Sequence, residues 1–443
     1  MKNYRPVSNL PFISKILEKI VALQIAEHLE EFSLLEVNQS AYRKLHNTET
    51  ALLKIFDDLL TNADNMRISV LVMLDLSAAF DTIDHTILGD RLGSLGFGGS
   101  VLNWFHSYLT NRTQSVSIND ITSDPVTLEF GVPQGSVLGP ILYTIYTTSL
   151  GKLIREHDID FHMYADDTQI YMSMDTLQPS HEKSKLETCL KSVKDWMLSN
   201  KLKLNDEKTE VIVCNPRQFV FHFDSILIGE QSIEPSHCAR NLGVFIDNKL
   251  NMNDHISHMC KSIYLELRRL KQASKYLNQS SLKTLASSFV LSRLDYCNSL
   301  FAKLPCYQVE RLQKLQNYAA RIIFNKPRRE HVTPLLLELH WLPVSARIDY
   351  KIAMLIFKSL NNLAPPYIKA LTEPYTPIRP LRSGSKNLLV NKVCHYKTVG
   401  ERSFSFYAPF LWNKLPQHLR DECTIDIFKS NLKTYLFRLS YNL

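Results

Sequence analysis

The sequence lacks the features of fibrous, secreted and linker-rich proteins. Only 13 of its 443 residues are glycine, and it contains neither an internal repeat nor a low-complexity segment, which excludes collagen-like and disordered chains. Its eight cysteines are scattered, the nearest pair being Cys297 and Cys306. This spacing fits neither a disulfide framework nor a zinc site and indicates reduced thiols inside the cell.

Long apolar runs are also missing. No stretch approaches the roughly 18 apolar residues that a membrane helix needs, and the opening residues, MKNYRPVSNL, lack the apolar centre of a signal peptide. The composition is nevertheless 45% hydrophobic, which is enough for a sizeable core. We therefore expect a soluble intracellular protein, in the nucleus or the cytoplasm, that has no membrane partner.

Charge is distributed unevenly along the chain. Residues 1–250 carry 22 lysines and arginines against 32 aspartates and glutamates, a net charge of −10, whereas residues 251–443 carry 29 against 12, a net charge of +17. An asymmetry of this size favours a nucleic-acid surface in the second part. The alternative is an ordinary solvated basic face.

Hydrophobic periodicity predicts mixed secondary structure before residue 250. The segment ISVLVMLDL, residues 68–76, fits a strand buried on both faces, and Asp75 lies at its end. The segment 161–172 reads as a hairpin whose turn is Ala165-Asp166-Asp167. The other elements expected here are helices over 13–29, 48–60, 85–95 (with Asp84 as N-cap) and 182–200, and a strand pair over 241–250.

Beyond residue 250 the pattern becomes helical. Apolar residues recur at helical spacing over 256–270 and again over 309–322. A domain boundary is therefore expected near residue 250. Prolines are frequent in the last hundred residues, so long helices should be interrupted there.

Two carboxylate positions suggest metal chemistry. Asp75 and Asp166 each lie at the end or turn of a strand-like element, and Asp167 is adjacent to the second. Carboxylates brought together in a partly buried site repel one another unless a divalent cation neutralises them. Two metal ions held this way support phosphoryl transfer. Taken singly, these signals are weak, because an aspartate after a strand is more often a turn residue or helix cap, and an Asp-Asp pair in a hairpin is more often solvated.

An ordered set of motifs is more specific than any single one. It runs in sequence through NYRPVSNLPFISKILEKIV, NQSAYRKLHNTETALL, VLVMLDLSAAFDTIDH, GVPQGSVLGPILYTIY, MYADDTQIY, LKLNDEKTEVIV and LGVFIDNKLNMNDHI, and continues with WLPVSARIDYKIAMLIFKSL and RSFSFYAPFLWNKLP. In this order the motifs resemble those of the reverse transcriptases of non-LTR retrotransposons, particularly the CR1, L2 and Jockey-like lineages of animals.

The resemblance implies a fold and an activity. The fold is α+β, a right-hand polymerase with a palm of antiparallel sheet and helices, partial fingers, and a mainly helical thumb and C-terminal region. Fingers and palm are expected over 1–250, a basic helical thumb over 251–335 and a C-terminal helical region over 336–443. The implied activity is RNA-directed DNA polymerisation, with an RNA template, a DNA primer, deoxynucleotides and two Mg²⁺ ions, for which Mn²⁺ could substitute.

The resemblance also assigns roles at the centre of the site. Asp75, which opens DLSAAFD, and Asp166, the first aspartate of YADD, correspond to the two metal ligands, and Asp167 supports the metal or primer-end geometry. Lys208, in NDEKTE, corresponds to a lysine near the nucleotide phosphates that can protonate the leaving pyrophosphate. The alternative for Lys208 is a surface lysine. Gly243, in NLGVFID, matches the primer-grip hairpin.

Five further positions resemble the family's nucleotide-binding residues. Phe80 stands where a ring packed against the sugar excludes a 2′-hydroxyl, and Gln134 of GVPQGS can hydrogen-bond to the template–nucleotide pair. Gly135, like Gly131, allows close backbone approach. Arg5 and Arg43 resemble the fingers arginines, which suit phosphate because of their rigid fork. The alternatives are a core phenylalanine, a surface turn and solvated arginines.

The basic part of the chain fits a thumb that follows a duplex backbone. Its cations gather in two clusters, whose contacts with phosphate give affinity without reading sequence. Interleaved Tyr264, Tyr276 and Tyr318 are expected to pack rather than stack on bases. His255 and His258 are expected on a helix surface, not at a metal. The clusters are Arg268, Arg269, Lys271 and Lys275, and Arg311, Lys314, Arg321, Lys326, Arg328 and Arg329.

The chain also departs from the family pattern. Relatives usually carry an endonuclease domain and further fingers before the NYRP motif, so both the endonuclease and part of the fingers are expected to be absent. Ala41-Tyr42 replaces a common Gly-Phe pair. The competing hypothesis is therefore a truncated, inactive remnant that binds nucleic acid non-specifically. RNA-templated RNA synthesis is disfavoured by Phe80.

Overall fold

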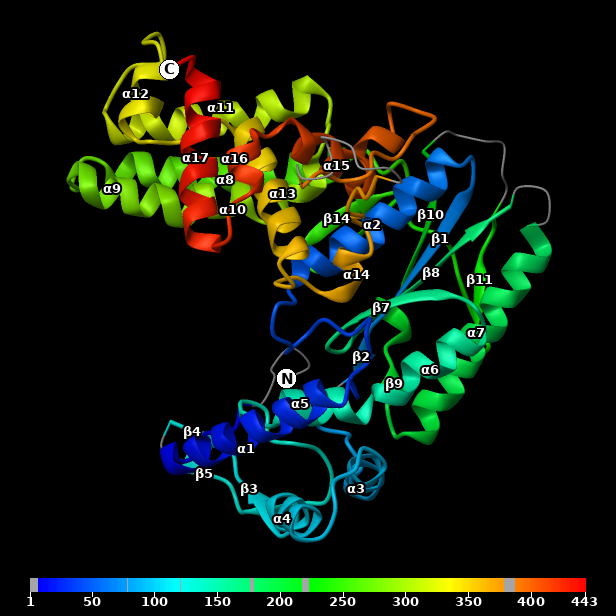
Figure 1. Ribbon diagram of the computed structural model, residues 1–443. Coiled ribbons are helices and arrows are strands. Elements are labelled where there is room, and N and C mark those ends of the chain that lie inside the picture. Colours follow the sequence, from blue (N-terminus) through cyan, green and yellow to red (C-terminus); the bar gives the residue numbers. More distant parts are fainter. Residues whose placement is uncertain (1–6, 78, 120, 176–178, 217–222, 378–386) are drawn as a thin grey trace. The chain divides into compact units, whose positions relative to one another are not determined.

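The computed structural model describes residues 7–77, 79–119, 121–175, 179–216, 223–377 and 387–443 (Figure 1). Arg5 lies outside these residues. The chain forms two compact units that interleave along the sequence: unit 1 is 1–44, 70–211 and 223–235, and unit 2 is 45–69, 212–222 and 236–443. The sequence-based borders at 250 and 335 stay a prediction.

A four-stranded sheet lies mostly within the residues of unit 1. Its strand order is β10-β1-β8-β7, with β1 (Ile68–Leu74), β7 (Asp160–Tyr164), β8 (Asp167–Met174) and β10 (Glu210–Cys214). All seven residues of β1 are buried, because an unbroken β-branched and apolar run can be covered on both faces. The strand predicted over 68–76 is therefore confirmed.

The predicted hairpin is confirmed, with a shorter turn. Strands β7 and β8 pair antiparallel, and Tyr164 faces Asp167 in the register. The turn thus consists of Ala165 and Asp166 alone, and Asp167 is the first residue of β8. Ala165 has a positive φ of 57°, as tight two-residue turns require.

Helices cover the sheet and flank it in unit 1. Helices α6 and α7 pack on the β7–β8 hairpin. Asp84 caps α3 as predicted, since its carboxylate accepts from the backbone N–H groups of Thr86 and Ile87. The helices of this unit are α1 (Phe12–Glu31), α3 (His85–Ser94), α4 (Ser100–Leu109), α5 (Gly139–Tyr146), α6 (Thr148–Glu156) and α7 (Pro179–Ser199).

Short strand pairs complete unit 1. They are β2 (Leu76–Ser77) with β9 (Lys203–Leu204), β3 (Arg112–Gln114) with β6 (Val126–Leu128), β4 (Ser117–Ile118) with β5 (Ile121–Thr122), and β11 (Ile226–Ile228) with β12 (Gln231–Ile233).

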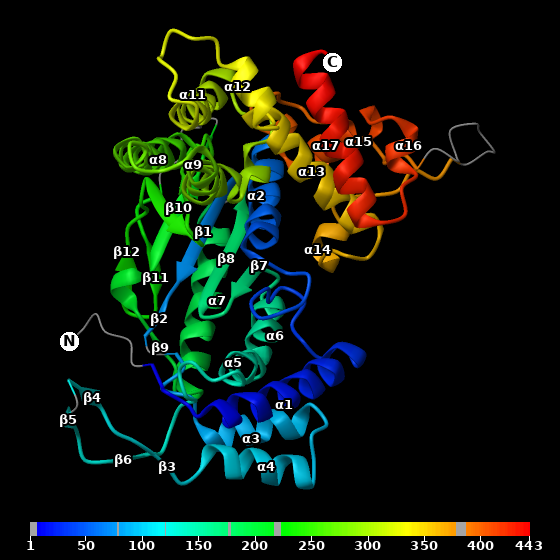
Figure 2. The same ribbon diagram turned by 90° about the vertical axis from the view of Figure 1, so that its left-hand side faces the viewer.

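Unit 2 is mainly helical. Helix α13 packs against α15 and α17, and the three lie side by side in both views (Figures 1 and 2). The stripe predicted over 256–270 is buried on α8, and the stripe over 309–322 lies on α11 with all but Val309 buried. The long elements are α2 (Thr48–Asp64), α8 (Asn253–Ala273), α9 (Gln279–Ala286), α11 (Cys306–Ile323), α13 (Val344–Leu360), α15 (Phe404–Lys414) and α17 (Ile425–Tyr441).

The remaining elements of unit 2 are short. Strands β13 (Cys238–Asn241) and β14 (Val244–Asp247) form a strand pair, but it begins and ends three residues earlier than the pair predicted over 241–250. Pro409 lies inside α15, so the expectation that prolines interrupt helices in this region is wrong at that position. The short helices are α10 (Ser292–Asp295), α12 (Thr333–Glu338), α14 (Pro366–Lys369) and α16 (Gln417–Arg420).

The α+β class, with antiparallel pairing and a mainly helical second part, is thus confirmed. Within the described ranges, helices that are long and apolar enough to cross a bilayer are absent.

Candidate functional site

Asp75 lies directly between β1 and the short strand β2. The pairing of Leu76 with Leu204 draws the segment after β9 against it. Asn205 donates its backbone N–H to the Asp75 carbonyl oxygen at 2.9 Å and its side-chain amide to Asp75 Oδ2 at 3.4 Å. Lys208 Nζ lies 3.2 Å from the same Oδ2, and the Asp75 side chain is 24% exposed. Asp75 is therefore held in place while its carboxylate still reaches solvent.

Asp166 and Asp167 lie at the same edge of the sheet as Asp75. Strand β8 is hydrogen-bonded beside β1, and the two run in opposite directions (Figures 1 and 2). In such a pair, the end of one strand adjoins the start of its neighbour. Asp75 follows the last residue of β1, and Asp167 begins β8. The strand order thus brings the two strand ends that carry Asp75 and Asp166, 91 residues apart in the sequence, to the same side of the sheet.

A buried glutamine holds the turn that carries Asp166. Gln39 accepts from the Ala165 backbone N–H through Oε1 at 3.1 Å, and its Nε2 donates to the Ala165 carbonyl oxygen at 3.5 Å. Gln39 is 1% exposed. Sequence analysis missed its role, although the residue stands inside the NQSAYR motif.

Tyr143 connects the acidic turn with Phe80. The rings of Phe80 and Tyr143 have centroids 5.0 Å apart. Burial raises the pKa of the Tyr143 hydroxyl well above its usual range, and the charges of Asp166 and Asp167 raise it further. Phe80 is only half-buried, so one part of its ring packs on Tyr143 while another stays accessible. Tyr143 was also missed, since its position in the apolar run of α5 looks like ordinary core.

The GVPQGS loop approaches the segment after Asp75 closely. Gly131 has a φ of 86°, and a Cβ there would lie 2.9 Å from the Asp81 carbonyl oxygen; the predicted close approach is confirmed at this glycine. Gln134 donates through Nε2 to both carboxylate oxygens of Asp81, at 3.0 and 2.9 Å. Gly135 is exposed with a φ of 95°. The loop thus presents Gln134 and Gly135 next to the Phe80 segment.

Arg43 lies in unit 1 and Gly243 in unit 2. Arg43 donates through Nη1 to the carbonyl oxygens of Glu36 and Gln39, at 2.6 and 3.1 Å, and so braces the segment that holds the acidic turn. Gly243 belongs to unit 2 and forms the two-residue turn between β13 and β14, with a φ of 85°. There the Tyr296 hydroxyl donates to the Leu242 carbonyl oxygen at 2.6 Å.

The carboxylates at the sheet edge suit a hard cation. They supply oxygen ligands and are partly exposed, and an ammonium group, Lys208 Nζ, already neutralises Asp75. Among the described residues, no cluster of three or more His, Cys, Asp or Glu side chains suitable for a metal occurs. Magnesium fits such a two-carboxylate set, because it keeps several waters and takes further ligands from substrate phosphates.

The two histidines of α8 have different environments. His258 is exposed as predicted, but the expectation of a surface position is wrong for His255, which is 5% exposed. Its Nδ1 accepts from the Phe245 backbone N–H at 3.4 Å, and burial lowers the pKa of His255 to about 4, with His258 contributing. His255 is therefore a neutral core residue.

A basic groove of about 790 Å³ lies within unit 2, and we call it the thumb groove because its residues fall in the range for which sequence analysis predicts a thumb. Tyr264 and Tyr318 line it, and Tyr264 is half-exposed. Tyr276 is 87% exposed, so the expectation that it packs is wrong. The cations of the groove are Lys271, Lys314, Arg321, Lys326 and Arg328, all of them members of the predicted basic clusters.

Comparisons with known proteins agree with these features. The family profile described as "Reverse transcriptase (RNA-dependent DNA polymerase)" matches residues 1–246. The chain is 26% identical over 369 residues to the "Probable RNA-directed DNA polymerase from transposon BS" of Drosophila melanogaster, covering 79% of this chain and 39% of that protein. It is 25% identical over 285 residues to the "RNA-directed DNA polymerase from mobile element jockey" of the same species, covering 63% of this chain and 31% of that protein.

The chain thus spans less than half the length of these relatives. Among solved structures, telomerase from Candida tropicalis in complex with a telomeric RNA fragment has a TM-score of 0.43 and 12% identity, covering 97% of this chain and 57% of that one.

Proposed function

Because the chain belongs to the reverse transcriptase (RNA-dependent DNA polymerase) family, we propose that it extends a DNA primer along an RNA template, using deoxynucleotides. The observation that carries the proposal is the placement of Asp75, Asp166 and Asp167 at one edge of the antiparallel sheet. Phosphoryl transfer depends chiefly on positioning and charge neutralisation, and this edge offers both.

Reverse transcriptases generally use divalent metal ions, and the donor set here fits them. Asp75 and Asp166 would hold two Mg²⁺ ions, or Mn²⁺ in their place, with Asp167 supporting the geometry. When bound, these ions make the primer 3′-hydroxyl a better nucleophile and neutralise the charge that develops on the leaving pyrophosphate. Asn205 keeps the Asp75 carboxylate oriented throughout.

Lys208 has two positions in this scheme. In the structure its ammonium lies against Asp75 and occupies the place of a cation. When Asp75 serves as a ligand, the flexible and 63% exposed lysine side chain is released toward the nucleotide phosphates. There it donates its proton to the leaving pyrophosphate.

Residues around the GVPQGS loop select and position the nucleotide. The exposed part of the Phe80 ring excludes a 2′-hydroxyl sterically. Gln134 has its amide nitrogen occupied by Asp81, which leaves its Oε1 to accept a hydrogen bond from the template–nucleotide pair. Gly135 would let the backbone of the GVPQGS loop come close to the nucleotide. Arg5 and Arg43, in the fingers, would bind the phosphates of the nucleotide.

Unit 2 would bind the nucleic acid. The thumb groove combines lysines and arginines with half-exposed tyrosine rings, a combination that follows a phosphate backbone without reading its sequence. The Gly243 hairpin would support the primer end. In this interpretation, fingers and palm occupy 1–250, the thumb 251–335 and a further helical region 336–443.

Primer extension on an RNA template tests the proposal. Asp75→Ala and Asp166→Ala should each abolish extension in the presence of Mg²⁺, because each removes a ligand of the metal pair. Asp195→Asn is the matched control, since it removes an exposed carboxylate on α7 in the same unit and should leave extension unchanged.

Two results would count against a polymerase. Primer extension that persists in the Asp75→Ala variant would contradict the proposed role of the carboxylates at this edge of the sheet as metal ligands. A wild-type protein that binds RNA–DNA duplexes in a salt-dependent way, yet gains no affinity from a matching deoxynucleotide and Mg²⁺, would favour the competing hypothesis of an inactive nucleic-acid-binding remnant.

A further inference from the structure

A second cavity, of about 670 Å³, lies among the C-terminal helices of unit 2 and shares no lining residue with the thumb groove. We call it the C-terminal basic pocket. Its walls come from α9, the segment 295–298, the loop 339–342, α13 and α17. Six of its lining residues are cations, namely Lys283, Arg347, Lys351, Lys358, Lys429 and Lys433, and Asp295 is the single carboxylate among them.

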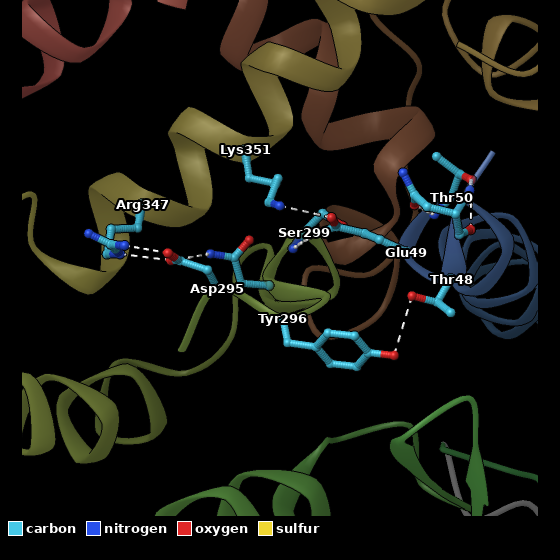
Figure 3. Close-up of polar contacts among 10 residues, drawn as sticks. Thr48, Glu49, Thr50, Asp295, Tyr296, Ser299, Arg347 and Lys351 are labelled. Carbon is cyan, nitrogen blue, oxygen red and sulfur yellow. Dashed lines mark hydrogen bonds and ion pairs between the residues drawn. The ribbon is translucent and has the colours of Figure 1, made fainter. Parts of the chain in front are cut away.

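Two of the cations are paired with carboxylates. Arg347 donates through Nε to Asp295 Oδ1 at 2.7 Å, and Lys351 Nζ lies 3.1 Å from Glu49 Oε2. Figure 3 shows both side chains extending from α13 toward these carboxylates. These pairs neutralise the buried Glu49 and the partly exposed Asp295 and hold α13 in place.

The other cations carry an excess of positive charge. Lys429 pairs with the exposed Asp426 at 3.2 Å. Lys283, Lys358 and Lys433 have no carboxylate within ion-pair distance in the part of the chain that the structure describes. Three ammonium groups thus face one cavity without an anion.

Like charges in the pocket repel one another. Lys358 is half-buried, and burial is the main cause that lowers its pKa. The positive charges of Lys351 and Lys429 lower the pKa further, and the negative charge of Glu49 raises it by less. A bound anion would relieve this repulsion. Binding of a negatively charged ligand in this pocket is therefore electrostatically favourable.

One buried acceptor in the wall points to the chemistry of the anion. Asn298 is 2% exposed, and its Nδ2 donates to Asp295 Oδ1 at 3.4 Å. Because a carboxylate can only accept, this contact leaves Asn298 Oδ1 facing elsewhere. That oxygen is buried and has no hydrogen-bond partner among the described residues. Phosphate diesters offer no donor to satisfy it, whereas a ribose 2′-hydroxyl does.

We propose that the C-terminal basic pocket binds the backbone of single-stranded RNA, with its unpaired lysines on the phosphates and Asn298 Oδ1 on a 2′-hydroxyl. At 1.5 Å per residue, Lys351 and Lys358 are about 10 Å apart along α13, and Lys429 and Lys433 about 6 Å apart along α17. A chain of phosphates can reach several of these cations at once, and a single phosphate ion cannot. The 2′-hydroxyl contact favours RNA over DNA.

The test measures binding without polymerisation, so its failure is separate from failure of the proposed activity. Fluorescently labelled oligo(U) and oligo(dU) are titrated with the full chain over a series of salt concentrations. The double variant Lys283→Ala/Lys433→Ala should lower the slope of log affinity against log salt by about 1.4 for oligo(U), since each phosphate contact on a single strand contributes about 0.7.

The matched control is the double variant Lys369→Ala/Lys397→Ala. Both lysines are exposed, belong to unit 2 and lie outside the two basic sites. This variant should leave the slope of log affinity against log salt unchanged. Asn298→Ala should weaken oligo(U) binding and leave oligo(dU) binding as it was. Melting curves verify that each variant is folded, and the corresponding glutamine variants at Lys283 and Lys433 replace any alanine variant that is not.

Three outcomes would overturn the proposal. The first is a slope change no larger for the pocket variant than for the control. The second is an equal effect of Asn298→Ala on oligo(U) and oligo(dU), which would remove the 2′-hydroxyl contact. The third is loss of the difference between wild type and pocket variant when inorganic phosphate is added at constant ionic strength, which would indicate a site for small anions.

Discussion

The Nζ atom of Lys208 lies 3.2 Å from Oδ2 of Asp75. The lysine comes from the turn after β9 and the aspartate from the end of β1, so the β2–β9 pairing brings together residues that are 133 positions apart. The contact places a proton donor beside the carboxylate that we propose as a metal ligand.

This pair makes the role of Lys208 testable. Lys208→Ala should lower kcat by about 100-fold or more, the usual contribution of a general acid. Lys208→Arg should restore the KM for the nucleotide but not kcat, because arginine keeps the charge and does not release a proton. Steady-state kinetics of primer extension separate the two effects, with Lys152→Ala as a control for an exposed lysine. Full recovery of kcat by arginine would contradict the acid role.

Sugar selection should depend on Phe80. Phe80→Ala should improve ribonucleotide use relative to deoxyribonucleotide use by about tenfold or more, roughly 1.4 kcal/mol of differential barrier. The physical reason is steric, because the half-buried ring exposes one part while Tyr143 supports the other. Incorporation efficiencies for both sugars on one primer–template measure the ratio.

A core role for Phe80 predicts a different result. The protein would then melt at a lower temperature, consistent with the several kcal/mol typical of a Phe→Ala cavity, and both nucleotide types would be impaired alike. Tyr143→Phe is the control, since it keeps the supporting ring and removes only its hydroxyl. An unchanged selectivity ratio in Phe80→Ala would refute the steric role.

Asp81 and Gln134 should act as a unit in nucleotide binding. The Gln134 amide donates to both Asp81 carboxylate oxygens, so losing either partner frees the other. In a double-mutant cycle on kcat/KM with Asp81→Ala and Gln134→Ala, the double variant should be no worse than the worse single variant. The coupling energy should lie within about 0.5–3 kcal/mol, the range for residues in contact. Additive losses would show that the contact has no part in function.

His255 should make stability fall at acidic pH. Its pKa is lowered to about 4 in the folded chain, against about 6.5 unfolded, so between these values the unfolded state binds more protons. The free energy of unfolding should therefore decrease as pH falls from 6.5 to 4, by roughly 3 kcal/mol from this residue. Denaturant unfolding of wild type and His255→Gln, compared pH by pH, isolates the contribution.

The comparison with a variant is needed because another buried group acts in the opposite sense. Burial raises the pKa of Asp57 to about 6 in the folded chain, so the folded state binds a proton at this carboxyl more readily than the unfolded state does. Asp57 therefore increases the free energy of unfolding as pH falls, which opposes the contribution of His255. A stability difference between wild type and His255→Gln that does not change with pH would contradict the assignment of His255 as a neutral core residue.

Local sequence patterns predicted much of this fold. The β-branched run of 68–76, the N-cap at Asp84 and the apolar stripe of α8 are each governed by neighbours within a few residues, and each is confirmed. The patterns failed where burial depends on distant segments. His255 is predicted on a helix surface but is buried in the core. Tyr276 is predicted to pack against other residues but is 87% exposed.

The sequence by itself determined which residues we propose to carry the chemistry, because Asp75, Phe80, Gln134, Asp166 and Lys208 stand in motifs whose order along the chain is specific. The tertiary structure alone decided what surrounds them. The Gln39 brace of the acidic turn joins positions 126 residues apart, and the C-terminal basic pocket gathers its lysines from three separate helices. Such arrangements follow from strand order and helix packing, which depend on contacts between segments that no local spacing encodes.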